Sequence, residues 1–404
     1  MSKKLLILGA GVYQVPLIKK AKEMGLFTIV SSIPGNYPGF ALADKVYYCN
    51  TTDKEAILEI AKEEKVSGLC TAGTDVAIAS IGYANQQLGL FGVGEEAASK
   101  TADKAVMQKA FDEGGVASAR SIRAGSPDEV RKAAEEIGLP VVVKCVDSSG
   151  ARGIRIVDNS EDLEEAYEYA LRYSHKDYVL VESKLPGTEI GVDGIVCDGK
   201  LIFVAPHQKS IYKSGQTTVT AGHNFPYDGS DALLEEIRQQ TQNAVDALGL
   251  DYCAVNLDAF VDGDDCYIIE IGGRSGATCI PELIERCYGF NYYEKIIDLA
   301  LGVPVSIPEL GKKYCKARLI MSPVDGTVTQ IDEAGLDVIR ADGIDVSLDI
   351  AVGSEVEVMT NGTNRLGAVI ADTDKEAEML YIMDRVYRCI YVDGMSLFDI
   401  WKKQ

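Results

Sequence analysis

Short apolar runs alternate with helix-periodic stretches at the start of the chain. The run KLLILGAG, from Lys4 to Gly11, ends in glycines, and residues 15–25 repeat apolar positions with a helical period. FTIVSS, KVYYC and SGLCTAG are further strand-like runs separated by helical stretches. Such alternation predicts a parallel α/β sheet. Ligands bind at the carboxyl ends of strands in these sheets, so Gly11, Thr74 and Asp75 are candidate substrate residues.

The pattern changes after a helical linker over about 95–113. The segments SIRAGS, DEVRKAAEEIG, LPVVVKCV, DSSGARG and IRIVD predict strand, helix, strand, loop and strand, and a second helix follows over Ser160–Tyr173. Two later segments turn at Asp-Gly pairs, at residues 198–199 and near 263, which predicts two β-hairpins. A helix is expected over Pro281–Leu301.

The remainder is rich in strand-like runs and turns and ends in a helix over Asp374–Tyr387. We therefore expect an α/β and α+β protein of three domains. These are a parallel α/β domain over 1–95, a middle domain of two α+β subdomains over 96–302, and a small β-rich domain over 303–404. One of the middle subdomains should cover about 116–184.

Composition narrows the functional classes. The 404 residues are 47% hydrophobic and 25% charged, which is typical of a globular protein. The net charge of −21 opposes binding to nucleic acid. The first apolar run is too short for a signal peptide, and no stretch of 18 apolar residues indicates a membrane span. The ten cysteines contain no C-x-x-C pair and suggest reduced thiols, so we expect a cytoplasmic protein.

Lys144 interrupts an otherwise apolar strand, VVVKCV. Because an unpaired buried ammonium is costly, an anionic partner is implied. The small-residue loop over 148–153 can bring backbone N–H groups close to phosphate oxygens. The alternative, a strand-edge lysine beside a flexible hairpin, carries equal weight when this segment is taken alone.

A strand that ends at Glu182 runs into a Pro-Gly break before the next strand begins. The linker from Glu182 to Leu185 could leave backbone groups available for the edge of a flat heterocycle, and Glu189 could accept from sugar hydroxyls. In isolation, two solvated strand ends are the more frequent explanation of these glutamates.

The segments NLDAF and IIEIGGR contain the third group of candidates. A hairpin turn between them sets Asp258 and Glu270 opposite or nearly so, about 4.5–5.5 Å apart at Cβ. Two such carboxylates repel each other unless a cation lies between them, and magnesium is the usual one. Two glycines then allow Arg274 to turn toward the same place. A purely structural carboxylate pair is the alternative.

Gly9-Ala-Gly11-Val-Tyr-Gln14 is a partial dinucleotide fingerprint. Gln14 replaces the third glycine, and no acidic residue ends the second strand to hold a ribose. The segment therefore favours a tight β–α turn beside a small-molecule site over an NAD site.

Taken in order, these motifs resemble the ATP-grasp superfamily in its carboxylate–amine ligase branch, over nearly the whole chain. The resemblance implies a pre-ATP-grasp domain, an ATP-grasp domain with a flap subdomain, and a β-rich C-terminal domain. It also implies roles for individual residues. They are two phosphate-binding lysines (Lys104 and Lys144), a glycine-rich flap (Ser148, Ser149, Gly150 and Gly153), an adenine-side hinge (Glu182, Ser183, Lys184 and Leu185), a ribose glutamate (Glu189), two metal carboxylates (Asp258 and Glu270) and an arginine that faces the γ-phosphate or acyl phosphate (Arg274).

The chain departs from the family pattern at one metal position. The family usually has E-x-N-x-R on the second metal strand, and Gly272 replaces the asparagine here. Asn256 is a candidate substitute. Gly222-His223 followed by Pro226 resembles the acceptor-side segment of amino-acid ligases, which makes His223 and Lys209 candidate substrate residues. The sequence after Arg274 lacks the bicarbonate pattern of biotin carboxylase, so biotin-dependent carboxylation is disfavoured.

The resemblance implies ATP-dependent ligation of a carboxylate to an amine through an acyl phosphate, with Lys144, Glu270 and Arg274 at the reacting groups. It implies ATP and Mg²⁺, allows Mn²⁺ and a homodimer, and indicates small, amino-acid-like substrates. Two alternatives stay open: a carboxylase of the purine-pathway type that uses bicarbonate, and a nucleotide-binding regulator without catalysis. A dehydrogenase is the weakest alternative.

Overall fold

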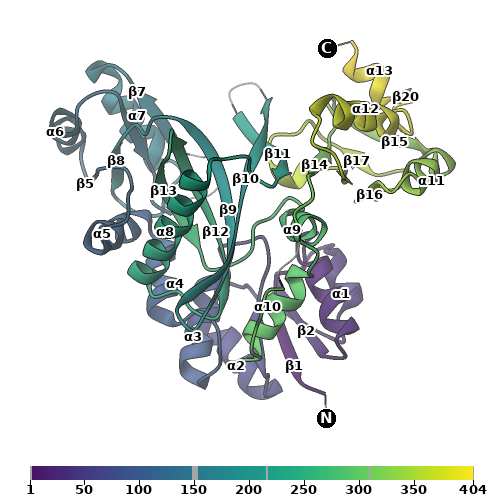
Figure 1. The fold of residues 1–404 in the computed structure, drawn as a ribbon, viewed down its shortest axis with the longest axis horizontal. Helices are drawn as coiled ribbons and strands as arrows, with labels where there is room; N and C mark the ends of the chain where they lie inside the picture. The colour runs from purple at the N-terminus through teal and green to yellow at the C-terminus, as the bar shows by residue number, and fades with distance from the viewer. Residues whose placement is uncertain (1, 148–152, 215–216, 309–310, 404) are drawn as a thin grey trace. The chain divides into compact units, whose positions relative to one another are not determined.

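The computed structural model describes residues 2–147, 153–214, 217–308 and 311–403 (Figure 1). Parallel and antiparallel sheets occur together, which confirms the mixed α/β and α+β class. The chain forms two compact units, each built from several segments. The first unit comprises Met1–Pro206, Asp228–Gly276 and Tyr293–Ile307, and the second comprises His207–Tyr227, Ala277–Tyr292 and Pro308–Gln404.

The amino-terminal part of the first unit is the expected parallel sheet. Its strand order is β3-β2-β1-β4, and all three neighbouring pairs are parallel. The loops that follow β1 and β4 therefore leave the same edge of the sheet, side by side. The elements are β1 (Lys4–Leu8), α1 (Val15–Glu23), β2 (Phe27–Ser32), η1 (Pro38–Leu42), β3 (Lys45–Tyr48), α2 (Lys54–Glu64), β4 (Gly68–Cys70) and α3 (Ile78–Leu88).

The predicted helical linker consists of two helices, α4 (Glu95–Ala102) and α5 (Lys104–Gly114). They meet at Asp103, whose φ of −133° and ψ of 113° are extended. The Asp103 carboxylate accepts hydrogen bonds from the backbone N–H groups of Ala105 and Val106. The linker divides here because the aspartate caps a new helix more favourably than it continues the old one. Lys104 is consequently the first residue of α5.

A four-stranded antiparallel sheet with the order β5-β8-β6-β7 follows. The apolar residues of α6 and α7 pack with those of the sheet in one core. The predicted order of strands and helices is confirmed here. The elements are β5 (Ser121–Ala124), α6 (Pro127–Ile137), β6 (Val141–Lys144), β7 (Ile154–Val157), η2 (Ser160–Asp162), α7 (Leu163–Leu171) and β8 (Val179–Ser183).

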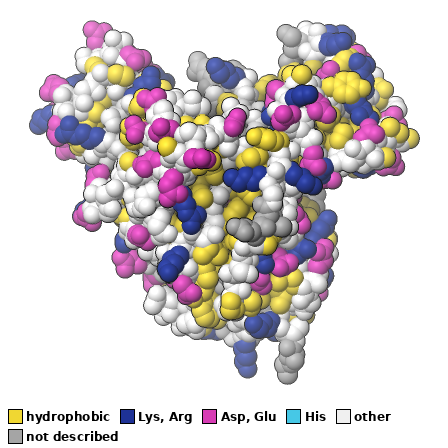
Figure 2. Space-filling model, viewed as in Figure 1, with side chains coloured by type: hydrophobic (Ala, Val, Ile, Leu, Met, Phe, Trp, Pro, Cys, Tyr) yellow, Lys and Arg dark blue, Asp and Glu magenta, His cyan; other side chains and the backbone are white. Residues whose placement is uncertain are grey.

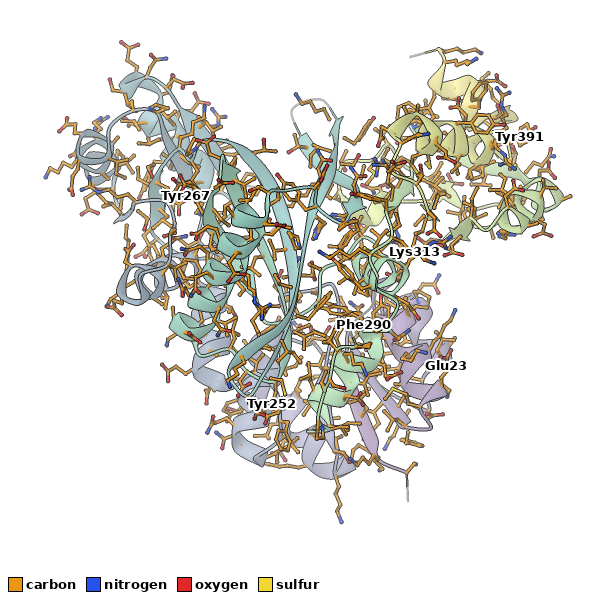
Figure 3. All side chains as sticks on the ribbon, in the orientation of Figure 1. Glu23, Tyr252, Tyr267, Phe290, Lys313 and Tyr391 are labelled. Carbon is orange, nitrogen blue, oxygen red and sulfur yellow. The ribbon has the colours of Figure 1, made fainter. Side chains whose placement is uncertain are left out.

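Both predicted hairpins are present. Asp198 and Gly199 join the first pair of strands with φ values of 53° and 69°, as expected of a turn that requires left-handed residues. Gly263, with φ of 60°, turns the second. In Figure 3, Tyr252 and Tyr267 mark opposite ends of this second hairpin. The elements are β9 (Thr188–Cys197), β10 (Lys200–Ser214), α8 (Asp231–Leu248), β12 (Cys253–Asp262) and β13 (Asp265–Gly272).

The single helix expected over 281–301 is also wrong. The chain forms α9 (Ile280–Tyr288) and α10 (Tyr292–Ala300). Gly289 separates them with φ of 78°, a left-handed conformation that commonly ends helices.

The second unit contains the end of β10 and an antiparallel run of strands in the order β10-β11-β14-β18-β16. A smaller sheet has the order β17-β15-β19-β20. The β-rich character is confirmed, but the sequence did not predict α11 and α13. The elements are β11 (Thr217–Phe225), β14 (Cys315–Ile320), β15 (Gly326–Ile331), α11 (Glu333–Ala341), β16 (Asp345–Leu348), β17 (Glu355–Val356), η3 (Gly362–Asn364), β18 (Gly367–Ala371), α12 (Glu376–Tyr387), β19 (Ile390–Val392), β20 (Met395–Ser396) and α13 (Leu397–Trp401).

Acidic and basic side chains are interspersed over the face drawn in Figure 2. Within the described ranges, no helix combines the length and apolar character needed to cross a bilayer.

Candidate functional site

The hairpin of β12 and β13 places two carboxylates opposite each other. Asp258 and Glu270 are direct cross-strand partners, as the sequence predicts. The register shifts by one residue next to Asp258, so Ile269 is an extra residue on β13. Without this bulge Glu270 would lie opposite Leu257 and project from the other face of the sheet. The bulge therefore brings both carboxylates to one face.

Helix α5 supports this hairpin with two side chains. Gln108 is 1% exposed and donates Nε2–H to the carbonyl oxygen of Ile269 at 3.0 Å, so the bulge carbonyl has a partner. One turn earlier, Lys104 Nζ lies 2.9 Å from Glu270 Oε2. The loss of surrounding water would raise the pKa of Glu270, but the charge and hydrogen bond of Lys104 outweigh it and lower that pKa. Glu270 is therefore ionised.

Lys144 on β6 and Glu182 on β8 form a buried ion pair. Nζ and Oε2 are 2.7 Å apart, and the side chains are only 4% and 7% exposed. The anionic partner implied by a buried lysine is thus a glutamate in this structure. The other carboxylate oxygen, Glu182 Oε1, is buried and has no hydrogen-bond partner among the residues that the structure describes. Such an orphan acceptor fits a ligand that donates an N–H, such as the exocyclic amine of a purine.

The predicted hinge is only partly available to a ligand. The backbone N–H of Ser183 donates to the carbonyl of Arg120 at 2.9 Å, and Ser183 Oγ accepts from Arg120 N–H at 3.0 Å. Pairing with Arg120 therefore uses the backbone N–H of Ser183, and a heterocycle at the hinge from 182 to 185 stays a prediction. Lys184 is exposed, Leu185 is half-buried, and Glu189 is exposed near the start of β9.

Arg274 follows β13 and lies in a polar network. Its Nε and Nη2 donate to the two carboxylate oxygens of Asp75, each at 2.7 Å. Nη1 donates to Asn256 Oδ1 at 2.5 Å and to the carbonyl of Ser275 at 3.1 Å. The Arg274 side chain is 15% exposed and the Asp75 side chain is 48% exposed. The structure therefore brings the candidates Asp75 and Arg274 together.

Sequence reasoning missed Asp193, the next member of this network. Asp193 is fully buried on β9 and accepts hydrogen bonds from Asn256 Nδ2 and from the backbone N–H of Gly276, both at 2.8 Å. Burial raises the pKa of Asp193 to about 7, although both hydrogen bonds act in the opposite direction. A signal was present, because Asp193 is the one charged residue in the run IGVDGIVC.

The side chain of Gln14 forms hydrogen bonds within the glycine turn after β1 and to the loop after β4. The N–H of Gly11 donates to Gln14 Oε1 at 2.9 Å, and Gln14 Nε2 donates to the carbonyl of Ala72 at 2.5 Å. Gln14 is 6% exposed. A dinucleotide phosphate at this helix start would need the same backbone N–H. The structure thus supports the preference for a simple β–α turn.

The donor set fits a metal that arrives with a nucleotide. Asp258 and Glu270 supply two carboxylates on one face. Among the residues that the structure describes, no group of three or more His, Cys, Asp or Glu could hold a metal ion. Magnesium is commonly bound by one or two carboxylates together with substrate phosphates. The pair therefore suits Mg²⁺ bound to a triphosphate.

The remaining candidate residues lie apart from this network or outside the described residues. Lys209 and His223 are cross-strand partners in the second unit. His223 is 4% exposed, and burial and then His207 lower its pKa well below the usual range. Thr74 is half-buried beside Asp75. The flap residues Ser148, Ser149 and Gly150 lie outside the described residues. Gly153 has φ of 68°, and a Cβ there would lie 2.8 Å from Cys145 Sγ, so this position requires glycine.

Known proteins resemble this chain in sequence and in fold. Residues 103–306 match the family described as "Carbamoyl-phosphate synthase L chain, ATP binding domain". A curated relative, "Carbamoyl phosphate synthase large chain, C-terminal section" of Aquifex aeolicus, is 26% identical over 322 residues, which cover 75% of this chain. The match spans 58% of that relative's length.

Two solved structures resemble nearly the whole chain. Phosphoribosylglycinamide synthetase from Anaerococcus prevotii has a TM-score of 0.82 and 30% identity, covering 97% of this chain and 99% of that one. L-amino acid ligase from Bacillus licheniformis has a TM-score of 0.78 and 16% identity, covering 98% and 99%. At that identity, the second likeness shows the fold alone.

Proposed function

Because this chain belongs to the ATP-grasp family of carboxylate–amine ligases, we propose that it uses ATP to activate a small-molecule carboxylate and joins it to an amine, releasing ADP and phosphate. One observation carries the proposal. The carboxylates of Asp258 and Glu270 lie opposite each other, with Lys104 bound to Glu270. Such a pair suits Mg²⁺ bound to phosphate groups, and phosphoryl transfer from ATP requires this ion.

We assign the binding of ATP to residues of the first unit. Lys104 and Lys144 are the cations for phosphate oxygens, and the unpaired Glu182 Oε1 is an acceptor for the purine amine. Asp258 and Glu270 would hold Mg²⁺, which supplies charge neutralisation to the phosphates when bound. Arg274 is the cation for the phosphoryl group in transfer. The residues of the flap would exclude water from an acyl phosphate.

We further propose that the substrates are amino-acid-like and carry no phosphate at the turn after β1. The support is Gln14, whose Oε1 accepts the N–H of Gly11, a donor that a phosphate at this turn would use. Asp75 and Thr74, and Lys209 and His223 in the second unit, remain candidates for substrate contacts.

The test is ADP and phosphate release from ATP and magnesium, with amino acids offered singly and in pairs, with and without bicarbonate. We expect release that depends on an amino acid or a particular pair. Glu270→Gln should lower it by about 10²–10³-fold or more, because a charge at the phosphates is lost. Asp265→Asn, an exposed carboxylate on the same strand, is the matched control and should leave it unchanged.

Three results would contradict the proposal. Release with bicarbonate alone would identify a carboxylase. Full activity in a well-folded Glu270→Gln protein would remove the metal assignment. Tight ATP binding without ADP release across the whole panel would instead favour a nucleotide-binding regulator.

A further inference from the structure

Arg274 is held by a residue from a distant part of the chain. Asp75 lies in the loop between β4 and α3, 199 residues away in sequence, and binds Arg274 through two parallel hydrogen bonds of 2.7 Å. The same loop makes a second contact, because the N–H of Gly73 donates to the carbonyl of Ser275 at 3.2 Å. The loop after β4 therefore forms hydrogen bonds with both Arg274 and Ser275, the residue that follows it.

Because Gly272 has no side chain, there is room beside it for the carboxylate of Asp75. A Cβ atom at position 272 would lie 2.8 Å from Asp75 Oδ1, closer than real Cβ atoms approach an oxygen. Gly272 is not among the described residues with positive φ, so its backbone conformation does not itself require glycine. The absence of a side chain at this position is therefore explained by the nearby carboxylate.

The other side of Arg274 is fixed by the neighbouring strands. Gly272 is the cross-strand partner of Asn256, and Asn256 is the partner of Asp193 on β9. Asn256 accepts from Arg274 and donates to Asp193. Within the described ranges, the contacts of Asp75, Asn256 and Ser275 use four of the five N–H groups of the guanidinium, which leaves one on Nη2 for a substrate oxygen.

We propose that Asp75 is a positioning residue that orients Arg274 toward the phosphoryl group, and that position 272 is glycine in order to admit it. The inference rests on the proposed function, which assigns Arg274 to that group. Position 272 carries no side chain in this chain, and the carboxylate of Asp75, from the parallel-sheet part of the same unit, lies beside it. A bidentate carboxylate–guanidinium pair fixes both the place and the plane of the cation.

The proposal can be tested by nucleotide binding without knowledge of the substrates. The readout is the ratio of the affinities of the full chain for magnesium–AMP-PNP and magnesium–ADP, measured by calorimetry, because only the first carries a γ-phosphate group. The Arg274→Ala variant shows how far the affinity ratio falls when the arginine is absent. Asp75→Ala should lower the ratio by roughly 10–100-fold, the usual effect of removing a residue that orients a ligand. Asp75→Asn, which keeps the shape and one acceptor, should give an intermediate value.

A double-mutant cycle tests the role of Gly272. Gly272→Ala should lower the ratio in the wild-type chain, since the new methyl group displaces Asp75. In the Asp75→Ala background the Gly272→Ala change should not lower the ratio further, because the Asp75 oxygen with which the methyl group would clash is absent. Melting temperatures of all variants are recorded alongside, since a purely structural role would lower them and leave the ratio unchanged.

Failure of the inference and failure of the proposed function give different results. If Arg274→Ala lowers the ratio but Asp75→Ala and Asp75→Asn do not, the positioning role is wrong and the proposed function stands. An equal loss from Gly272→Ala in both backgrounds would also overturn the role of Asp75. If Arg274→Ala leaves the ratio unchanged, the assignment of Arg274 is wrong, and the inference is overturned with it.

Discussion

At the scale of single residues, each cation assigned to phosphate is paired with a carboxylate. Lys104 binds Glu270, Lys144 binds Glu182, and Arg274 binds Asp75. These pairs hold the cations in place before a ligand arrives.

The buried pair of Lys144 and Glu182 allows structure and binding to be separated. Lys144→Met should lower the free energy of unfolding by about 3–5 kcal/mol, because it leaves the carboxylate of Glu182 buried without a partner. Adding Glu182→Leu should restore most of this stability, since two apolar residues can replace a buried ion pair. Nucleotide binding should stay lost in both variants. Urea unfolding and calorimetry with magnesium–ATP measure the two effects.

A double variant that binds ATP as the wild type does would show that Lys144 does not bind phosphate. A single variant as stable as the wild type would show that the pair does not matter to the fold.

At the scale of elements, the β-bulge at Ile269 decides which face Glu270 occupies. The bulge depends on α5, because Gln108 satisfies the carbonyl of Ile269. The helix that begins with Lys104 thus sets both the register of the hairpin and the charge beside it. The linker helices therefore belong to the site and do more than connect two domains.

Gln108→Leu tests this dependence. It removes the donor to Ile269, which should cost about 1–3 kcal/mol of stability and weaken magnesium–AMP-PNP binding by roughly 10–100-fold. Lys109→Ala, an exposed neighbour on the same helix, is the control and should change neither quantity by a comparable amount. Unaltered nucleotide binding in folded Gln108→Leu protein would contradict the role given to the bulge.

The elements that the sequence predicts best are those with a local signal. The Asp-Gly turn at 198–199 and the glycine at 263 specify hairpins whatever the rest of the chain does. The breaks at Asp103 and Gly289 were missed, because periodicity continues across them while a cap or a left-handed residue ends the helix. A bulge such as that at Ile269 has no local signature in this segment.

At the scale of the whole molecule, the fold class and the order of the motifs could be predicted, whereas the contacts between distant segments could not. The strand periodicity and the ordered motifs indicated the architecture and the opposed pair Asp258 and Glu270. The contact of Asp75 with Arg274 joins segments 199 residues apart, and no local pattern encodes such a pair. For the same reason, the sequence indicated only that Gly272 lacks the metal-ligating asparagine of the family. The structure shows that the carboxylate of Asp75 lies beside this position.

The most direct test of carboxylate activation is to determine whether an oxygen atom of the substrate carboxylate is transferred to the released phosphate. The amino acid that supports ADP release is labelled with ¹⁸O in its carboxylate and incubated with ATP, magnesium and the amine acceptor, and the released phosphate is examined by mass spectrometry. Ligation through an acyl phosphate predicts one ¹⁸O atom in each phosphate, because the carboxylate oxygen that attacks phosphorus leaves with it. Phosphate without label, at equal ADP release, would contradict the proposed ligase.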